Sequence, residues 1–369
     1  MVRSIGIDPG TRSFSLFGIE EDKIVLDEDV PSSMVAEEPD KLIEIIENVE
    51  ADIIVGPSGY GLPLKRVEEL KEEDFFLLIL RKPEDKGISV LEGLVEFVKI
   101  AREKKLPMIF IPSVIQLPTV PTYRKLNKID MGTADKLAVT VLAVKEVAEE
   151  RDLNYEDINI IVVEVGGAYT SLIAVRNGRI VDGIGGSQGC IGFMSHGRMD
   201  GEVAYLYGGI RKIKLFEGGV VDIIGDKELK PEEFPKKAFE SSRGKDAWDL
   251  FFEEIEKFFC MMTVSVPKPM EVVLSGRMVE VPEVKSELEE RLEKYAPVRK
   301  LRGFDAKSKT PAQGSAVIGN GLLGGKYKAL IEHMRIKEAS GTVLDYVLIS
   351  NWKENVKKYG VNIKLVYEK

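Results

Sequence analysis

Residues 2–26 read VRSIGIDPGTRSFSLFGIEEDKIVL, and residues 160–181 read IIVVEVGGAYTSLIAVRNGRIV. Each stretch begins with an apolar run, passes an acidic residue and a glycine-containing turn, and continues as two further apolar runs. Short apolar runs bounded by Gly, Pro and charged residues are typical of β-strands. The sequence therefore predicts the same three-stranded meander twice, once at the start of the chain and once in its middle.

A repeat of this length predicts two related domains, because the units of a solenoid are only about 20–50 residues long. The 369 residues also exceed the size at which a single core stops growing. Between the meanders, amphipathic helices alternate with apolar strands, which is typical of an α/β fold. We expect one domain over residues 1–155, a second over 156–335, and a tail over 336–369 that packs back on the first.

The remaining elements follow from hydrophobic periodicity and from Gly or Pro boundaries. The expected strands are 52–56, 108–111 and 271–274, and the expected helices are 41–49, 89–104, 133–151, 246–262 and 284–295. A helix rich in Gly and Ala is expected after Pro311, and the tail is expected to add a helix and a last strand.

Composition excludes several classes of protein. The net charge of −9 lacks the positive footprint of a nucleic-acid-binding protein. No segment approaches the ~18 consecutive apolar residues of a membrane span, and no apolar signal region precedes the first strand. The two cysteines, Cys190 and Cys260, cannot form a disulfide framework and favour a reducing compartment. We expect a cytoplasmic protein with neither nucleic-acid nor membrane partners.

The turn of the first meander, residues 6–13 (GIDPGTRS), has the composition of a phosphate-binding turn. Glycine permits close approach of the backbone, and backbone N–H groups and hydroxyls can surround phosphate oxygens. Asp8 cannot bind phosphate itself, but it can hold Mg²⁺. An ordinary Asp-Pro-Gly turn is the alternative. The candidate phosphate ligands are Gly10, Thr11, Arg12 and Ser13.

The turn of the second meander, residues 164–171 (EVGGAYTS), repeats this arrangement of strand, acid, glycine and hydroxyl. A hairpin without a function does not need the same composition twice, so the pair favours phosphate binding. Here Glu164 is the candidate metal ligand. The candidate phosphate ligands are Gly166, Gly167 and Thr170.

Two later glycine segments are candidate nucleotide contacts. Gly276 and Arg277 follow a strand and open a helix-like stretch, where an anion or a nucleotide sugar can bind. Residues 313–321 (QGSAVIGNG) carry small residues at helical spacing, including Gly314. Such a surface accepts adenine or a neighbouring helix, and helix packing is the favoured interpretation of the two.

These turns, in this order over residues 2–325, resemble the superfamily of acetate and sugar kinases, heat-shock chaperone ATPases and actin. The resemblance implies two duplicated actin-like (ribonuclease H-like) domains, each a five-stranded mixed sheet flanked by helices. It also implies that ATP with Mg²⁺ lies in the interdomain cleft, with the two turns on its phosphates and Gly276 near adenosine.

Within the superfamily the sequence is most similar to the acetate and butyrate kinases. Residues 55–63 (VGPSGYGLP) resemble their substrate loop, which makes Gly59, Tyr60 and Gly61 candidate substrate contacts. Residues 187–201 (SQGCIGFMSHGRMDG) resemble the segment that carries an Arg facing the transferred phosphoryl group, and Arg198 is the matching position. The chain is also similar to an archaeal butyrate-kinase-like family (DUF1464).

The sequence departs from these kinases in the substrate loop, because residues 56–63 contain no Arg. A planar guanidinium is the natural bidentate partner of a substrate carboxylate. If the acceptor is a carboxylate, we expect Lys65, Arg66 or Arg124 to take this part.

Two further residues are candidates for the chemistry. Thr133 is a predicted N-cap that places Asp135 in the first turn of a helix, where it orients the acceptor or simply favours the helix dipole; Asp130 is the alternative acid. His196 lies beside Arg198 and can donate to a phosphoryl oxygen, or it is a solvated loop residue.

The expected function is a Mg²⁺-dependent kinase that transfers the γ-phosphoryl group of ATP to a small-molecule acceptor with a carboxylate or hydroxyl. The alternatives are an ATPase, sensor or assembly protein of the same fold that transfers no phosphoryl group, or a scaffold without catalysis. A homodimer is an assembly that the sequence leaves open.

Overall fold

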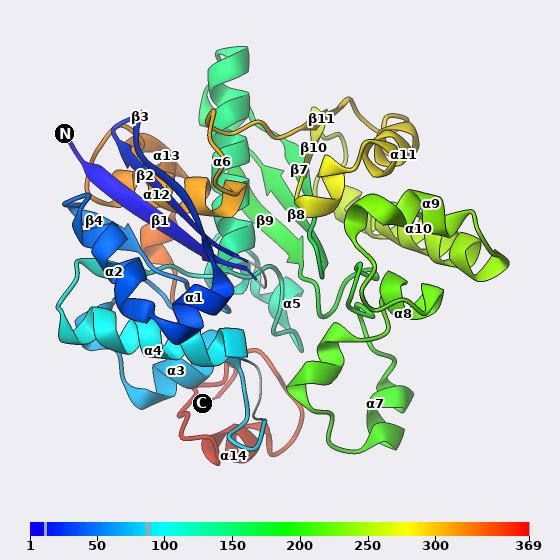
Figure 1. Cartoon of the computed structure of the whole chain (residues 1–369), viewed down its shortest axis with the longest axis horizontal. Coiled ribbons are helices and arrows are strands. Elements are labelled where there is room, and N and C mark those ends of the chain that lie inside the picture. The colour runs from blue at the N-terminus through cyan, green and yellow to red at the C-terminus, as the bar shows by residue number, and fades with distance from the viewer. Residues whose placement is uncertain (11–12, 86–88, 369) are drawn as a thin grey trace. The chain divides into compact units, whose positions relative to one another are not determined.

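The structure is a computed structural model that describes residues 1–10, 13–85 and 89–368. The chain forms two compact units, which are considered separately below (Figure 1). Unit 1 contains residues 1–129, 133–155 and 302–369, and unit 2 contains residues 130–132 and 156–301. Residues 302–335, which we expected in the second domain, therefore cluster with the first.

Unit 1 is built on a six-stranded mixed sheet with the order β3-β2-β1-β4-β6-β5. Strands β1, β2 and β3 form an antiparallel meander, while β4 and β6 continue the sheet parallel to β1. The two-residue strand β5 is antiparallel to β6. The strand bounds are β1 Arg3–Pro9, β2 Ser13–Glu20, β3 Lys23–Pro31, β4 Ile53–Val55, β5 Lys65–Arg66 and β6 Met108–Phe110.

Unit 2 is built on a five-stranded sheet with the order β11-β10-β7-β8-β9. It repeats the first five positions of the unit 1 sheet, with an antiparallel meander β7-β8-β9 and two parallel strands, β10 and β11. The strand bounds are β7 Ile160–Val165, β8 Thr170–Arg176, β9 Arg179–Ile184, β10 Glu271–Ser275 and β11 Val298–Lys300.

The two meanders agree in strand register as well as in strand order. Asp8 pairs with Ser15 across β1 and β2, and Glu164 pairs with Ser171 across β7 and β8. The second and third strands of each meander carry one bulge, between Gly18 and Ile19 in unit 1 and at the equivalent step in unit 2. The duplicated pattern in the sequence is therefore a duplicated backbone.

Helices α6 (Ala134–Arg151) and α12 (Thr310–Leu322) pack together in unit 1, and α12 lies against β1 (Figure 1). The contact is close because small residues line it: a Cβ on Gly6 would lie 2.1 Å from the Ala312 carbonyl oxygen. This packing is the reason that residues 302–335 belong to unit 1. The other helices of this unit are α1 Ser32–Glu37, α2 Pro39–Glu47, α3 Glu72–Ile79, α4 Ser89–Glu103, α5 Thr122–Lys125, α13 Lys328–His333 and α14 Trp352–Lys357.

The C-terminal tail contacts other parts of unit 1. The Ser340 N–H donates to the Gln116 carbonyl (3.1 Å), and the Asn127 N–H donates to the Tyr346 carbonyl (2.9 Å). The Tyr359 ring stacks on a ring of α3 at 5.2 Å. The tail helix that we expected is α14, but the described residues of the tail contain no strand.

Unit 2 has its core between its sheet and α10 (Ser242–Thr263). The Ser241 hydroxyl accepts the Gly244 N–H (3.0 Å), which caps the start of this helix. Large apolar side chains then recur at helical spacing on the buried face, including Phe251, Phe252 and Phe259. The other helices of this unit are α7 Gly201–Tyr207, α8 Val220–Ile224, α9 Phe234–Ala238 and α11 Pro282–Leu292.

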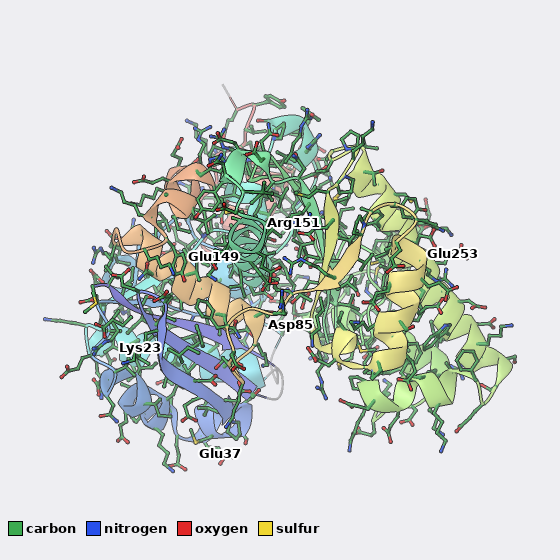
Figure 2. The ribbon with its side chains drawn as sticks, turned by 90° about the horizontal axis from the view of Figure 1, so that it is seen from above. Lys23, Glu37, Asp85, Glu149, Arg151 and Glu253 are labelled. Atoms are coloured by element: carbon green, nitrogen blue, oxygen red, sulfur yellow. The ribbon has the colours of Figure 1, made fainter. Side chains whose placement is uncertain are left out.

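Charged side chains such as Lys23, Glu149, Arg151 and Glu253 project from the ribbon of the two units (Figure 2). Such a surface agrees with the charge-rich composition. Within the residues that the structure describes, no helix is both long and apolar enough to cross a lipid bilayer.

Candidate functional site

The face of β1 that packs on α12 ends at Asp8. Alternate residues of a strand point to the same side of the sheet. On this side the Ser4 hydroxyl donates to the Ala316 carbonyl (2.8 Å), and Gly6 lies against the preceding turn of α12. Asp8 comes next along the strand, which brings its carboxylate to the N-terminal end of α12.

Four charged groups influence one another at this position. The Asp8 side chain is buried, and it accepts no hydrogen bond from any described residue. Burial raises the pKa of Asp8 to about 6; Lys309 and Lys136 lower it, and Asp135 raises it further. These two carboxylates and two ammonium groups thus lie around the end of β1 in unit 1, and the carboxylate of Asp29 also raises the pKa of Asp8.

Asp135 lies in the first turn of α6, with Thr133 as the N-cap, as the sequence predicted. Its carboxylate accepts hydrogen bonds from the Thr133 hydroxyl and from Lys136 Nζ, the latter at 2.7 Å. Burial on its own would raise the pKa of Asp135, but Lys136 and Thr133 stabilise the ionised form more strongly, so the pKa lies below its usual value.

The first turn is closed by a hydrogen bond from the Gly10 N–H to the Ser13 carbonyl (3.0 Å). Lys309 Nζ donates to the same carbonyl at 2.8 Å, and a Cβ on Gly10 would lie only 2.5 Å from this nitrogen. Gly10 therefore leaves room for an ammonium group beside the turn. Two predicted ligands, Thr11 and Arg12, lie outside the described residues.

Lys309 is a candidate site residue that the sequence analysis missed. It is the N-cap of α12 and makes no side-chain cap, although this position ordinarily favours Ser, Thr, Asp or Asn. The start of a helix carries a partial positive charge, so a lysine there is electrostatically unfavourable. That mismatch, two residues before Pro311, is the signal that could have identified it.

The second turn, in unit 2, has the same closure as the first. The Gly166 N–H donates to the Tyr169 carbonyl (2.9 Å), and the buried Glu164 carboxylate lies beside Gly166. The hydroxyls of Thr170 and Ser171 are fully buried, and no described residue hydrogen bonds with them. A buried polar group without a partner costs about 1–3 kcal/mol, so these hydroxyls point to a missing partner.

Gly276 and Arg277 lie beside the second turn. A Cβ on Gly276, which has a φ of 100°, would lie 2.4 Å from the Val165 carbonyl oxygen. A Cβ on Gly167 would lie 3.8 Å from Cγ of Arg277, whose guanidinium forms an ion pair with Glu232. The structure thus brings the predicted contacts from two segments of unit 2 together.

Arg198 and His196 lie in the glycine-rich loop of unit 2. The Arg198 guanidinium lies over the Phe258 ring, 5.2 Å from its centroid, and its side chain is exposed. It does not pair with Asp200, whose carboxylate caps α7. Both ring nitrogens of His196 are buried and have no hydrogen-bond partner in the part of the chain that the structure describes. His196 is therefore not the solvated residue of the alternative interpretation.

Asp130 has a structural role in unit 2. Its carboxylate accepts hydrogen bonds from the Gly132 N–H (3.1 Å) and from the N–H and hydroxyl of Ser187 (3.1 and 3.0 Å). A Cβ on Gly185 would clash with the same carboxylate. The alternative acid of the sequence analysis thus anchors a loop of its own unit.

Three predicted glycine contacts have packing roles instead. A Cβ on Gly59 would lie 2.1 Å from the Leu78 carbonyl oxygen, and one on Gly61 would lie 2.2 Å from the Ser113 nitrogen. Both glycines also have positive φ angles, so backbone conformation requires them. A Cβ on Gly314 would lie 2.0 Å from the Ala138 carbonyl oxygen, so Gly314 permits the α6–α12 contact, and the adenine interpretation is withdrawn.

The basic residues near the predicted substrate loop have interactions of their own. Lys65 Nζ pairs with the buried Asp74 carboxylate at 2.6 Å. Arg66 is 63% exposed at its side chain, and the Arg124 guanidinium lies 5.6 Å from the Tyr123 ring centroid. Tyr60 is partly exposed, and its N–H donates to the Leu78 carbonyl at 3.0 Å.

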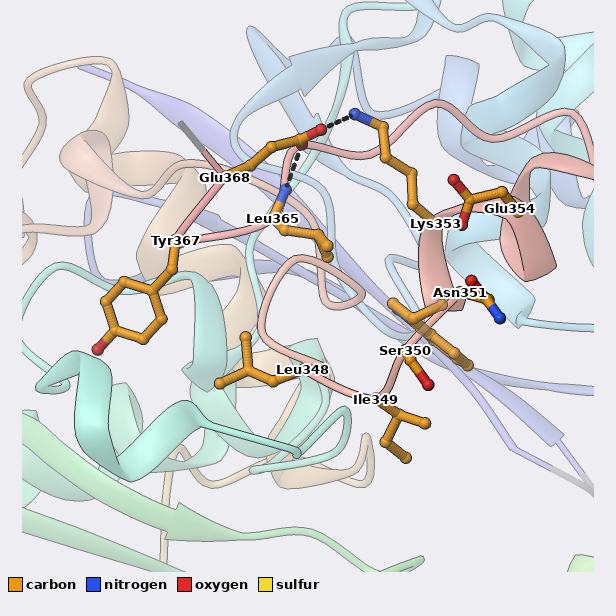
Figure 3. Close-up of a pocket in the computed structure, with 10 residues that line it drawn as sticks. Leu348, Ile349, Ser350, Asn351, Lys353, Glu354, Leu365, Tyr367 and Glu368 are labelled. Carbon is orange, nitrogen blue, oxygen red and sulfur yellow. Dashed lines mark hydrogen bonds and ion pairs between the residues drawn. The ribbon is translucent and has the colours of Figure 1, made fainter.

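A pocket of about 310 Å³ lies in the C-terminal tail, and none of the predicted site residues lines it (Figure 3). Its lining includes Leu348, Trp352 and Tyr367, with the ion pair between Lys353 and Glu368 at 2.5 Å.

Comparisons with known proteins identify the fold. Over 85% of this chain and 99% of the other, a propionate kinase from Francisella tularensis superposes with a TM-score of 0.61 at 15% identity. Acetate kinases from Porphyromonas gingivalis (86% and 98% covered, TM-score 0.57, 13% identity) and Entamoeba histolytica (79% and 87%, 0.55, 11%) are also similar. The chain therefore has the actin-like α/β fold that the sequence predicted.

Sequence comparison places the chain in a family. It matches none of the curated proteins. The profile of a family described as "Protein of unknown function (DUF1464)" matches residues 6–349, and the chain belongs to this family.

Proposed function

We propose that this protein is an ATP-dependent kinase that transfers the γ-phosphoryl group to a carboxylate or hydroxyl of a small molecule. The observation that carries the proposal is the buried Asp8 carboxylate, which ends β1 beside a glycine turn and accepts no hydrogen bond from a described residue. A buried carboxylate is costly unless a partner compensates it. A divalent metal ion that also binds phosphate would supply the positive charge that this carboxylate lacks.

The residues around Asp8 fit Mg²⁺ bound to a nucleotide. Mg²⁺ in phosphoryl-transfer sites is usually bound by one or two carboxylates, with phosphate oxygens and water as the other ligands. Outside the residues that the structure leaves undescribed, no group of three or more His, Cys, Asp or Glu side chains could hold a metal ion. Asp8 would therefore bind the ion jointly with phosphate, and the ion would neutralise charge on the transferring group.

The second turn is proposed to bind phosphate oxygens through its backbone and the Thr170 hydroxyl. Backbone N–H groups in a tight turn form an anion-binding concavity. The orphan hydroxyl of Thr170 supports this assignment, and Glu164 is proposed to take part in holding the metal ion through water. Gly276 and Arg277, beside the same turn, are proposed to contact the nucleoside.

Arg198 and His196 are proposed to act on the transferring phosphoryl group. Phosphoryl transfer depends mainly on positioning and charge neutralisation. The bond from the γ-phosphorus to the ADP oxygen breaks, and a bond to the acceptor oxygen forms. Arg198 supplies a permanent positive charge to the equatorial oxygens, and His196 supplies a ring N–H as donor.

The acceptor side is proposed to include Asp135 and Tyr60. A hydroxyl acceptor releases one proton during transfer, and the ionised carboxylate of Asp135 can orient that hydroxyl or accept its proton. A carboxylate acceptor needs a cation instead. Lys65, the first basic residue after the predicted substrate loop in the sequence, already forms an ion pair with Asp74. This pairing favours a hydroxyl acceptor.

The test is a coupled assay of ADP release. Thermal-shift measurements with ATP, ADP and Mg²⁺ establish nucleotide binding first. A panel of short carboxylates and of polyols is then added with ATP and Mg²⁺. ADP release that depends on an acceptor is the expected result, and ADP release that no acceptor stimulates would contradict the proposal.

The alternative is an ATPase of the same fold that transfers no phosphoryl group to a small molecule. One observation favours it: Gly59 and Gly61 pack against the backbone of their own unit, so the glycine content of the predicted substrate loop is explained without a substrate. Acceptor-independent release of ADP is the outcome that distinguishes this alternative.

A further inference from the structure

Lys309 reaches back from the start of α12 to the first turn. Its Nζ donates to the Ser13 carbonyl at 2.8 Å and occupies the space that a side chain on Gly10 would need. Its N–H approaches the Ser15 hydroxyl (3.3 Å). The lysine is therefore held at its backbone and at the tip of its side chain, both against the same hairpin.

The two lysines near Asp8 differ in how they are paired. Lys136 forms a direct ion pair with Asp135 at 2.7 Å. Lys309 forms no ion pair with a described residue, and its single hydrogen-bond acceptor is a neutral carbonyl. An ammonium group has three N–H donors, so two donors of Lys309 remain for another acceptor.

The local electrostatics oppose this arrangement unless an anion is present. The N-terminus of α12 carries a partial positive charge, and Lys309 adds a full one as its N-cap. The Asp27 carboxylate lies at the same helix start, where it accepts hydrogen bonds from the N–H groups of Lys307 and Ser308 (both 2.8 Å). Those donors engage Asp27, so the ammonium group of Lys309 has no anionic hydrogen-bond acceptor among the described residues.

We infer that Lys309 binds the terminal phosphate of the nucleotide beside Gly10 and Ser13. The inference rests on the proposed function, because it requires nucleotide at this turn. The ligand chemistry is that of a polyphosphate: ATP and ADP carry phosphates beyond the α-phosphate, whereas AMP and adenosine do not. Lys309 thus contributes to discrimination among nucleotides by phosphate number.

The experiment compares Lys309→Met with Lys307→Met by calorimetric titration with ATP, ADP and AMP in the presence of Mg²⁺. Lys307 is the matched control because it lies in the same segment and is exposed. A hydrogen bond to a charged group contributes enough that its loss weakens binding about tenfold to a hundredfold. We expect that loss for ATP and ADP in Lys309→Met, an unchanged affinity for AMP, and wild-type affinities in Lys307→Met.

Two negative outcomes separate the inference from the proposed function. If the wild-type protein binds ATP and ADP but Lys309→Met binds them equally well, the inference about Lys309 is wrong and the proposed function stands. If the wild-type protein binds no adenine nucleotide, both are wrong.

A second measurement uses only the wild-type protein and so does not depend on the folding of a variant. Lysines are acetylated with a small reagent, and the modified positions are quantified by mass spectrometry. We expect ADP with Mg²⁺ to protect Lys309, adenosine to leave it reactive, and Lys307 to react equally in both samples. Equal modification of Lys309 with ADP and with adenosine would overturn the inference.

Discussion

The two meanders share strand register and turn closure but differ in the side chains around their acidic residues. In each, the acidic residue at the end of the first strand pairs with a serine, Asp8 with Ser15 and Glu164 with Ser171. In each, a glycine N–H closes the turn on a carbonyl three residues later. Such agreement in register is the expected result of duplication, because a shift by one residue would reverse the face of every side chain.

The surroundings of the two acids have diverged. Asp8 has Lys309, Lys136 and Asp135 within electrostatic reach. The second turn has orphan hydroxyls instead, with Arg277 beside it. We therefore propose that the first turn neutralises charge and that the second turn provides hydrogen bonds, and the predictions that follow test this division.

The largest expected difference is between Asp8→Asn and Glu164→Gln, which remove the equivalent charge from the two turns. A bound metal ion supplies several kcal/mol of transition-state stabilisation. Asp8→Asn is therefore expected to lower Mg²⁺-dependent turnover about a thousandfold, and Glu164→Gln only about tenfold. Steady-state rates at saturating ATP and Mg²⁺ measure both, with melting temperatures as the control for folding. Equal losses in the two variants would end the division between the turns.

Arg198 tests whether unit 2 contributes a cation to the chemistry in addition to hydrogen bonds. Removing one preorganised donor to a transition state typically costs about 10²–10³-fold in turnover, and Arg198→Ala is expected to fall in this range. The exposed contact with Phe258 contributes only about 0.5–1 kcal/mol, so the melting temperature should change by a few degrees at most. Arg198→Lys, which keeps the charge, should recover part of the rate. Wild-type turnover in Arg198→Ala would favour the ATPase alternative.

The two serines that pair with these acids allow the turns to be compared by their effect on stability. The Ser15 hydroxyl donates to Asp29, whereas the equivalent Ser171 hydroxyl has no partner among the described residues. Ser15→Ala is expected to lower the free energy of unfolding by about 0.5–1.5 kcal/mol, because the exposed Asp29 can hydrogen bond with water instead, and Ser171→Ala is expected to leave it unchanged or higher. Urea unfolding of the two variants without nucleotide measures this difference. A loss at Ser171 equal to that at Ser15 would mean that its hydroxyl has a partner within the protein.

The last prediction concerns pH and belongs to unit 1 alone. Burial lowers the pKa of Lys125 to about 8, and its Nζ donates to the Leu117 carbonyl at 2.8 Å. Between pH 8 and about pH 10.5 the unfolded chain binds more protons than the folded one at this lysine, so its contribution to stability rises with pH. Below pH 8 it is protonated in both states, and the contribution is constant.

Lys125→Met should abolish this rise. Urea unfolding at pH 7.5 and pH 9.5 is expected to show that wild-type protein gains stability relative to Lys125→Met as pH increases. The exposed Lys105 gives the control variant, Lys105→Met, which should follow the wild-type protein. A constant difference between the wild-type protein and Lys125→Met would show that Lys125 titrates normally.

Much of the fold could be predicted because each meander is bounded by strong turn residues and alternates clearly. The strands expected at 2–7 and 158–165 are confirmed within two residues at each end, as β1 and β7. Strand β11 was missed because its three residues include Arg299 and Lys300, and β5 consists only of Lys65 and Arg66; neither has an apolar pattern. Residues 302–335 were placed in the wrong unit because helix periodicity does not reveal which sheet a helix covers.

The candidate site was predictable where chemistry is local in the sequence. The strand-end acids and the turn glycines were found from spacing alone. Lys309 was missed because it is about 300 residues from Asp8, and only the packing of α12 on β1 brings it there. Gly59 and Gly61 were predicted as substrate contacts and have packing roles, because a glycine required by packing and a glycine required by a ligand look the same in a sequence. For Gly314, helix packing was the favoured interpretation, and the α6–α12 contact agrees with it.

The position of α12 in unit 1 has a consequence for the order in which the molecule is made. The ribosome releases the N-terminal strands first, but the helix that covers the Ser4–Gly6 face of β1 is synthesised only after all of unit 2. Unit 2 draws nearly all its residues from one continuous segment and can complete its core as that segment emerges. Until α12 is synthesised, the face of the N-terminal sheet that this helix covers stays exposed. Exposed apolar surface is the condition under which nascent chains aggregate or recruit chaperones. Biosynthesis therefore completes the second half of the duplication before the first.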